Sequence, residues 1–226
     1  TAVNLWISDN AEALIQYGHI SDWDVSLITD MSSLFYFKQT FNDDISGWDV
    51  SNVTSMHYMF HHADIFNQDL SDWDVSSVTT MDGMFYNALS FNQDLNDWDV
   101  SKVGNMEHMF NHALVFNGDI SNWDVSNSSR FKEMFRNTPF NQDISNWDVS
   151  GITQSNGMRY MFYDCPFNQD ISDWDVSNVP DMLDIFLNAG LSDENKCAIH
   201  TVFSSNENWP YDWSEFCVSV NGCTDP

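Results

Sequence analysis

The sequence FNQDLSDWDVSSVTTMDGMFYNA, residues 66–88, decides the fold, because the chain repeats it about seven times. The steps between successive Trp-Asp-Val-Ser motifs are 25, 25, 25, 25, 24 and 27 residues. The motifs begin at Trp23, Trp48, Trp73, Trp98, Trp123, Trp147 and Trp174. A fixed period of this size is typical of a solenoid, in which each unit forms one coil and buries its apolar side against its neighbours.

Within one coil, Ile45, Trp48, Val50 and Val53 follow the apolar spacing of a leucine-rich repeat. Trp48 and Val50 alternate with polar residues, which predicts a short strand with both side chains inward. The apolar residues of the next segment share one face of a short helix: Val53, Met56, Met59, Phe60 and Ala63. The sequence therefore predicts an α/β solenoid, a right-handed, leucine-rich-repeat-like stack of about seven coils with short parallel strands and short helical segments.

The repeats span residues 21–190 and are flanked by two segments that break the period. Residues 1–20 are helical in pattern, with Asp9 or Asn10 as the N-cap and Gly18 as the end, which predicts an N-terminal cap. Residues 191–220 carry Trp209, Trp213 and Phe216 and are interpreted as a C-terminal cap. Residues 221–226 are interpreted as the start of a following module or a linker.

The motif Phe-Asn-Gln-Asp-Ile/Leu-Ser-x-Trp-Asp-Val-Ser-x-Val-Thr-x-Met-x-x-Met-Phe is nearly complete at 41–60, 66–85 and 91–110. It resembles the bacterial surface protein 26-residue repeat family, which is related to the BspA-like leucine-rich repeat surface proteins. The resemblance covers roughly residues 20–190. It implies an extracellular or cell-surface setting and an interaction role, and it supplies no catalytic residues.

The charge of the chain restricts its partners. There are 34 Asp and Glu against 7 Lys and Arg, which gives a formal net charge of −27. Such a surface repels nucleic acid and anionic lipid, and no apolar run reaches the roughly 18–20 residues of a membrane helix. We therefore expect no nucleic-acid partner and no membrane insertion. An extracellular protein or glycan with basic groups, or a metal cation, suits this charge.

Two rows of aspartates form the candidate binding surface. If Trp48 and Val50 point inward, Asp49 between them points outward, and a second aspartate directly before the Trp joins the same face. The row after Trp comprises Asp24, Asp49, Asp74, Asp99, Asp124, Asp148 and Asp175. The row before Trp comprises Asp22, Asp72, Asp97 and Asp173. We interpret these residues as an acidic sheet face that binds a cationic partner.

Stacked carboxylates about 5 Å apart repel each other by roughly 1 kcal/mol even in water, so the row needs compensation. One alternative is a set of hydrogen bonds from the backbone or from the serine of the neighbouring coil. The other is Ca²⁺ held between coils by oxygen ligands, with Asp49, Asp74, Asp99 and Asp124 as its ligands. The absence of an EF-hand loop favours the hydrogen bonds. A further column, Asp44, Asp69, Asp94, Asp119, Asp143 and Asp170, precedes the strand and is assigned to backbone bonding.

Two other residue types suggest structural roles. Cys197 and Cys217 are the preferred disulfide pair, which indicates an oxidising compartment and leaves Cys223 for a partner downstream. Cys165 occupies a position held elsewhere by Ala and is predicted to be a small buried thiol. The repeated Asn of the Phe-Asn pair, such as Asn67, is expected to form a ladder bonding the turn backbone of adjacent coils.

The other groups of residues give only weak evidence for a binding or catalytic site. The tryptophans alternate with Asp at a core position, which favours buried packing over a platform for sugars. His108 and His112 stand four residues apart, which is only half of a metal site. The acidic positions are uniform along the chain, whereas an active site breaks symmetry, so we expect no enzyme.

The preferred function is an extracellular recognition or adhesion module; a structural spacer between modules is the alternative, and a glycan-active enzyme comes third. The oligomeric state is left open.

Overall fold

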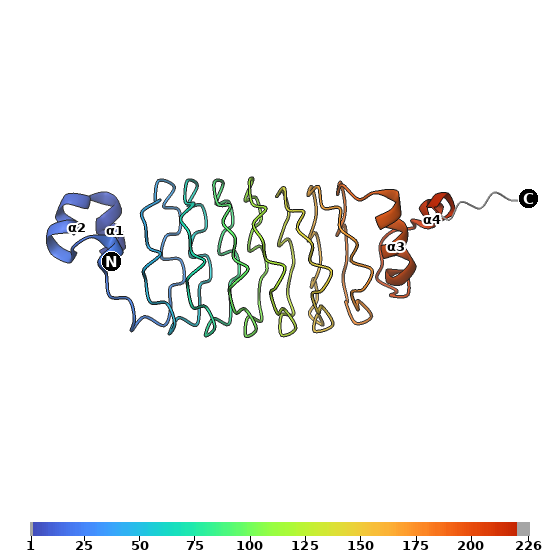
Figure 1. Cartoon of the computed structure of the whole chain (residues 1–226), viewed down its shortest axis with the longest axis horizontal. Coiled ribbons are helices and arrows are strands. Elements are labelled where there is room, and N and C mark those ends of the chain that lie inside the picture. Colours follow the sequence, from blue (N-terminus) through green and yellow to red (C-terminus); the bar gives the residue numbers. More distant parts are fainter. Residues whose placement is uncertain (1, 221–226) are drawn as a thin grey trace, which may run out of the picture.

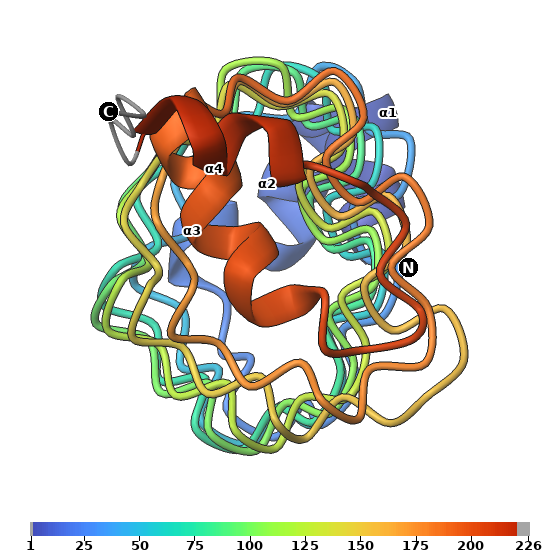
Figure 2. The same cartoon turned by 90° about the vertical axis from the view of Figure 1, so that its right-hand side faces the viewer.

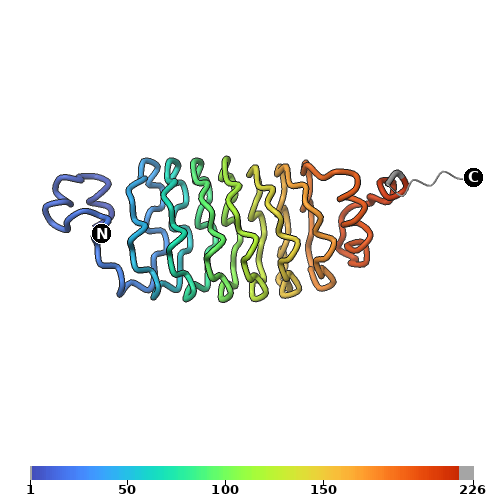
Figure 3. Tube along the Cα trace, viewed as in Figure 1, coloured from blue at the N-terminus to red at the C-terminus, as the bar shows by residue number. Residues whose placement is uncertain are grey.

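The computed structural model describes residues 2–220, in which helices stand at both ends of a row of coils (Figure 1). Two helices, α1 (Ala2–Ser8) and α2 (Asn10–Tyr17), precede the row, and a short 3-10 helix, η1 (Ile20–Asp22), leads into it. Two more, α3 (Asp193–Phe203) and α4 (Ser214–Val220), follow it. The tube in Figure 3 shows successive coils side by side, with the two described ends far apart.

The core consists of columns of identical side chains that run along the stack, and the coils superimpose when viewed end-on (Figure 2). One such column has ring centroids 5.3 to 5.9 Å apart between neighbouring coils. It comprises Phe35, Phe60, Phe85, Phe110, Phe135, Phe162 and Phe186. Fully burying one such ring contributes about 1.5–3 kcal/mol. The same residue thus stabilises every interface between coils.

The expected strand at Trp-Asp-Val does not form. Tight turns stand on both sides of it, with Trp48 N donating to Ile45 O and Val53 N donating to Val50 O. The inward Trp side chain makes the link between coils instead. In the central coil, the Trp98 indole N–H donates to Leu70 O of the preceding coil at 2.9 Å. The inward orientation of Trp and Val was predicted well, but the backbone element was wrong.

The expected helix from Val53 to Ala63 is also absent, although its apolar residues are buried as predicted. The backbone N–H groups alternate between two kinds of acceptor. Tyr58 and Phe60 donate to Asp82 O and Met84 O of the next coil, at 2.9 and 2.8 Å. The intervening Met59 donates back to Met56 O in its own coil, at 3.1 Å. The segment is a chain of tight turns in which every fourth residue, such as Tyr58 at φ 55°, is left-handed.

Coil spacing explains why neither regular element forms. Packed helices lie about 8–10 Å apart, so a helix in every coil cannot fit a spacing below 6 Å between stacked Phe rings. A strand places every second residue on one face, whereas the inward residues Ile45, Trp48, Val50 and Val53 are three, two and three positions apart. Among residues 2–220 the sheet-like contacts are single parallel bridges, Asp30–Ser55, Ser55–Thr80 and Thr80–Asn105. The assignment to an α/β, leucine-rich-repeat-like class with parallel strands is therefore wrong; the coils consist mostly of turns and loops.

The asparagine ladder forms as expected. Asn67 Oδ1 accepts from Asn92 N at 2.9 Å and from Gln93 Nε2 at 2.9 Å, so each Asn-Gln pair binds the coil before it. The ladder runs from Asn42 to Asn168. At its end Ser192 N and Asn195 Nδ2 donate to Asn168 Oδ1 at 2.8 and 2.9 Å. The start of α3 therefore takes the place of a seventh member of the ladder.

The N-terminal helices lie against the first coils. Asp9 caps α2 by accepting from Glu12 N, and Gly18 ends it with φ 75°, as the sequence predicted. The break at Asp9 separates α2 from α1, which the sequence pattern did not resolve. Trp6 of α1 is buried and donates its indole N–H to Asp43 Oδ2 at 2.7 Å, which fixes the helix to the second coil.

The C-terminal helices carry the expected disulfide, Cys197–Cys217, which joins α3 to α4. The buried side chain of Asn206 donates to Val176 O and Val179 O of the last coil. Cys165 is a buried free thiol, as predicted, whereas the assignments for Cys223 and 221–226 lie outside the described residues. Within residues 2–220, the structure contains no helix with the length and apolar character that crossing a membrane requires.

Candidate functional site

The two rows of aspartates point outward as predicted, but among residues 2–220 there is no sheet face to carry them, because the Trp-Asp-Val segments form no strand. All are exposed, while the Trp residues between them, from Trp48 to Trp174, are at most 4% exposed. We call this surface the acidic edge. Its members are Asp22, Asp24, Asp49, Asp72, Asp74, Asp97, Asp99, Asp124, Asp148, Asp173 and Asp175. Because equal positions of successive coils are in register, the edge runs along the whole row of coils.

Each aspartate that follows a Trp is satisfied within its own coil. Asp49 Oδ1 accepts from Ser51 N at 3.1 Å and from Ser51 Oγ at 2.6 Å, and Asp99 repeats this pattern with Ser101. Bonds of this kind favour the short Asp and Ser side chains in turns. The compensation is therefore local, from the serine two residues ahead rather than from the neighbouring coil.

These hydrogen bonds lower the pKa of several aspartates of the edge, namely Asp24, Asp49, Asp99, Asp148 and Asp175. The Ser51 hydroxyl and backbone N–H hold the pKa of Asp49 below its ordinary value, and the charge of Asp24 opposes them only as the smallest contribution. The pKa of Asp148 is lowered in the same way by Ser150, against the weaker effect of Asp175. Since Oδ1 faces the turn, the second oxygen of each carboxylate is left for solvent or a partner.

The aspartates that follow the Asn-Gln pair use the same motif. Asp44 Oδ1 accepts from Ser46 N and Ser46 Oγ at 2.9 and 2.7 Å, and the pKa of Asp44 is lowered, chiefly by the backbone bond. Asp94 differs, because its Oδ1 accepts from Asp119 N of the next coil at 2.8 Å. Backbone bonding, the role assigned to this column from the sequence, accounts for these contacts.

The carboxylates of the acidic edge do not converge on a common point. Within residues 2–220 no group of three or more His, Cys, Asp or Glu side chains is arranged to hold a metal ion. His108 and His112 do not share a ligand position either. His108 Nδ1 lies 3.3 Å from Asp82 Oδ1, whereas His112 Nε2 lies 3.1 Å from Asn137 Nδ2.

A second surface, which we did not anticipate as a unit, lies over the tight turns between Met56 and Ala63 and their equivalents. We call it the turn face. In coils two to five it gathers aromatic and titratable side chains: His57, Tyr58, His61, His62, Asp82, Tyr86, His108, His112, Glu133 and Arg136. The sequence feature that marks the turn face is variation, because its positions differ from coil to coil while the core positions repeat.

Charged groups on the turn face link several coils. Asp82 lies between two imidazoles, with Nδ1 of His57 and of His108 each 3.3 Å from one of its oxygens. Glu133 receives Arg136 at 3.1 Å and Lys132 at 3.5 Å. Burial opposes the ionisation of Glu133, but the Arg136 hydrogen bond and the neighbouring cations outweigh it, so its pKa is lowered.

His61 is the most perturbed group of the turn face. Burial, followed by the proximity of His62, lowers the pKa of His61 to about 4. Its ring stacks on Tyr86 at 4.6 Å, and its buried Nδ1 has no hydrogen-bond partner among the described residues. A hollow of about 370 Å³ lies beside it, lined by Tyr58, His61, His62, Tyr86, His108 and Glu133.

The comparison with protein families concerns the repeats as a whole. The model of a family described as "Mycoplasma protein of unknown function, DUF285" matches residues 6–117 and again residues 93–200. The chain belongs to this family. The two matches each span several coils, and together they cover the row along with α2 and most of α3.

Membership in DUF285 supports the assignment of the chain as a bacterial repeat protein, and it assigns no activity to the chain. It does not support the narrower relation to BspA-like leucine-rich repeats, and the coils lack the strand that such repeats require. No curated protein matches the chain. No solved structure matches it either.

Proposed function

We propose that the chain is a recognition module of an extracellular or cell-surface bacterial protein, which binds an extended cationic partner along the acidic edge. The observation that carries this proposal is the register of the exposed aspartates, repeated coil after coil on one surface. Serine hydrogen bonds lower the pKa of Asp49 and Asp99, which favours the charged form of these two carboxylates. The disulfide supports an oxidising compartment.

The regular spacing of the edge suits a partner whose positive charges also repeat, such as a basic segment of a protein or a basic glycan. A single exposed ion pair contributes only about 0–1 kcal/mol, so affinity has to come from several pairs formed together. The net charge of −27 also steers cations towards the chain and makes association sensitive to salt.

The experiment titrates the full chain with decalysine at low and high salt. The test variant replaces Asp49, Asp74, Asp99 and Asp124 by Asn, which keeps an Oδ1 acceptor for the turn serine and removes four charges. A charge-matched control changes Asp9, Glu12, Asp193 and Glu194, in or beside the helices of the two ends, to their amides. We expect roughly tenfold weaker binding for the edge variant and little change for the control.

Two results would overturn the proposal. Equal losses in both variants would mean that decalysine responds to net charge alone. No binding at low salt would favour the alternative function, a structural spacer between modules of a secreted protein. The straight row of coils in Figure 1 is the observation that favours the spacer.

Calcium is part of the same experiment. Because each Oδ1 of Asp49 and Asp99 is occupied by its own turn, we expect millimolar Ca²⁺ to raise the melting temperature no more than Mg²⁺ at equal ionic strength. A larger rise with Ca²⁺, lost in the edge variant, would instead establish ligation by the row, since a ligand of the native state raises its stability.

A further inference from the structure

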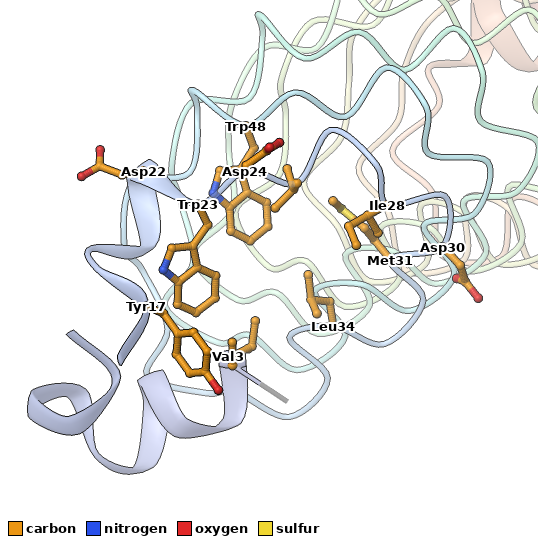
Figure 4. Close-up of a pocket in the computed structure, with 12 residues that line it drawn as sticks. Val3, Tyr17, Asp22, Trp23, Asp24, Ile28, Asp30, Met31, Leu34 and Trp48 are labelled. Atoms are coloured by element: carbon orange, nitrogen blue, oxygen red, sulfur yellow. The ribbon is translucent and has the colours of Figure 1, made fainter. Parts of the chain in front are cut away.

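An apolar pocket of about 490 Å³ lies where the N-terminal helices meet the first coil. Figure 4 shows its wall: Tyr17 and Val3 come from the helices, and Trp23, Ile28, Met31 and Leu34 come from the coil, around an open centre. Trp48 of the second coil closes one side, with its ring 6.5 Å from that of Trp23.

The pocket follows from the position of the first coil in the row. Every later coil has its apolar side covered by the coil before it, which leaves Val50 and Val75 each 1% exposed. The first coil is covered by α1 and α2 instead, and they cover it incompletely. Val25 is 8% exposed, and Trp23 is only partly buried. As far as residues 2–220 show, the pocket is therefore unfilled core space beside the first coil, lined mainly by apolar side chains.

Charge selects which apolar group can enter. Asp22, Asp24 and Asp30 all line the pocket, and their carboxylates lie at its periphery in Figure 4, away from the centre. No Lys or Arg is among the lining residues. The hydrogen bonds of Ser26 to Asp24 and of Ser32 to Asp30 favour the charged carboxylates. An apolar group that carries an anion is thus repelled, whereas one flanked by cations is attracted.

Asp22 and Asp24 are also the first members of the two rows of the acidic edge. The pocket and the edge are therefore one continuous surface, apolar at the N-terminal end and acidic along its length. In protein interfaces a few anchor residues that fill apolar pockets supply most of the affinity, while exposed charged contacts contribute less.

We propose that the pocket is the anchor site for one aromatic or large aliphatic side chain of a basic polypeptide, whose remaining positive residues lie along the acidic edge. This inference rests on the proposed function and adds to it the register and chemistry of the partner. The anchor fixes where the basic segment begins, which the repeating edge alone cannot do.

The test compares decalysine with the same peptide carrying one Trp at its end, in titrations of the full chain. We expect the Trp peptide to bind roughly tenfold or more tightly, because the indole leaves water on entering the pocket. Ile28→Trp fills the pocket from its wall. Leu27→Trp is the matched control, because Leu27 is 88% exposed and does not line the pocket. Ile28→Trp should abolish the advantage of the Trp peptide and leave decalysine binding unchanged; Leu27→Trp should preserve both.

The outcomes separate the two proposals. Equal affinities of the two peptides for the wild type, with the edge variant still weakened, would overturn the anchor and leave the acidic edge standing. Tryptamine and indole-3-acetate give a readout of the pocket without the edge: binding of the cation alone supports the anchor, and equal binding of both contradicts its charge selectivity. Concentration-dependent self-association that Ile28→Trp abolishes would assign the pocket to a second copy of this chain and would also overturn the anchor.

Discussion

Left-handed residues at fixed positions of the tight turns set the path of each coil. Tyr58, Gly83, His108 and Glu133 are equivalent residues with φ between 55° and 57°. A side chain in this region costs about 1–2 kcal/mol relative to glycine, and the inter-coil hydrogen bonds on either side hold it there. Glycine at position 83 avoids this backbone cost, and it also leaves room for the Tyr58 ring, which occupies the space that a Cβ would take.

Gly83→Ala should lower the free energy of unfolding by about 1–2 kcal/mol or more, since its Cβ would meet two ring carbons of Tyr58. Urea denaturation measures this loss. Gly47→Ala is the control, because nothing lies within 4 Å of its Cβ position. In a Tyr58→Ser background, which copies Ser33 of the first coil, part of the Gly83→Ala loss should disappear. An unchanged loss there would contradict the contact with Tyr58.

His61 should make stability depend on pH. Its folded pKa of about 4 is below the ordinary value of 6.5, so between these values the unfolded chain binds a proton that the folded chain does not. Stability therefore falls as pH drops from about 6.5 towards 4. His62, His57 and Asp82 also act on this group, and Asp82 favours its protonation.

His61→Tyr copies the residue found at the equivalent position in the third coil, Tyr86. We expect this variant to lose less stability than the wild type between pH 7 and pH 4.5, measured by urea denaturation at each pH. Parallel pH profiles for the two proteins would show that burial of His61 does not govern acid sensitivity.

Hydrogen-bonded rows take the place of regular elements in the coils. The tight-turn segment donates alternately to its own coil and to the next, and the Asn-Gln pair donates to the coil before it. Backbone polar groups are nearly always paired in native proteins, so these rows do for this fold what a sheet does elsewhere. Among residues 2–220, helices occur only where the row of coils begins or ends, because there the coil spacing no longer limits their width.

The disulfide should stabilise the C-terminal helices without affecting the coils. It closes a loop with a sequence separation of 20 residues, which corresponds to about 3 kcal/mol by loop entropy. Reduction, or Cys197→Ser with Cys217→Ser, should speed hydrogen exchange of amides in α4 and leave the amides around Asn67 and Asn92 protected. If the amides of α4 and those around Asn67 and Asn92 lost protection together, the C-terminal helices would not be independent of the coils in stability.

At the scale of the molecule, stability is a sum over neighbouring coils. Deleting residues 95–119 removes 25 residues, one whole period, and joins Asp94 to Ile120 in the same register. We expect this variant to fold cooperatively with a lower melting temperature. Deleting 95–107 removes about half a period, so the core columns no longer align and the chain should not fold. Circular dichroism melts distinguish the two. If the two deletion variants gave the same melting curve, the register between coils would not determine the stability of the fold.

The sequence by itself determined the period, the inward Trp and outward Asp, the cap of α2, the ladder of Asn and the Cys197–Cys217 pair. Each of these features depends on interactions that are local in the chain or that recur at one fixed spacing. Such interactions can be recognised in a single sequence. The tertiary structure decided the path of the backbone, because the spacing between coils excludes a helix and the tight turns exclude a strand. It also decided which varying side chains meet on the turn face, and where the first coil leaves a pocket. Those depend on what lies next to each residue in the adjacent coil, or on the lack of such a coil at the end of the row.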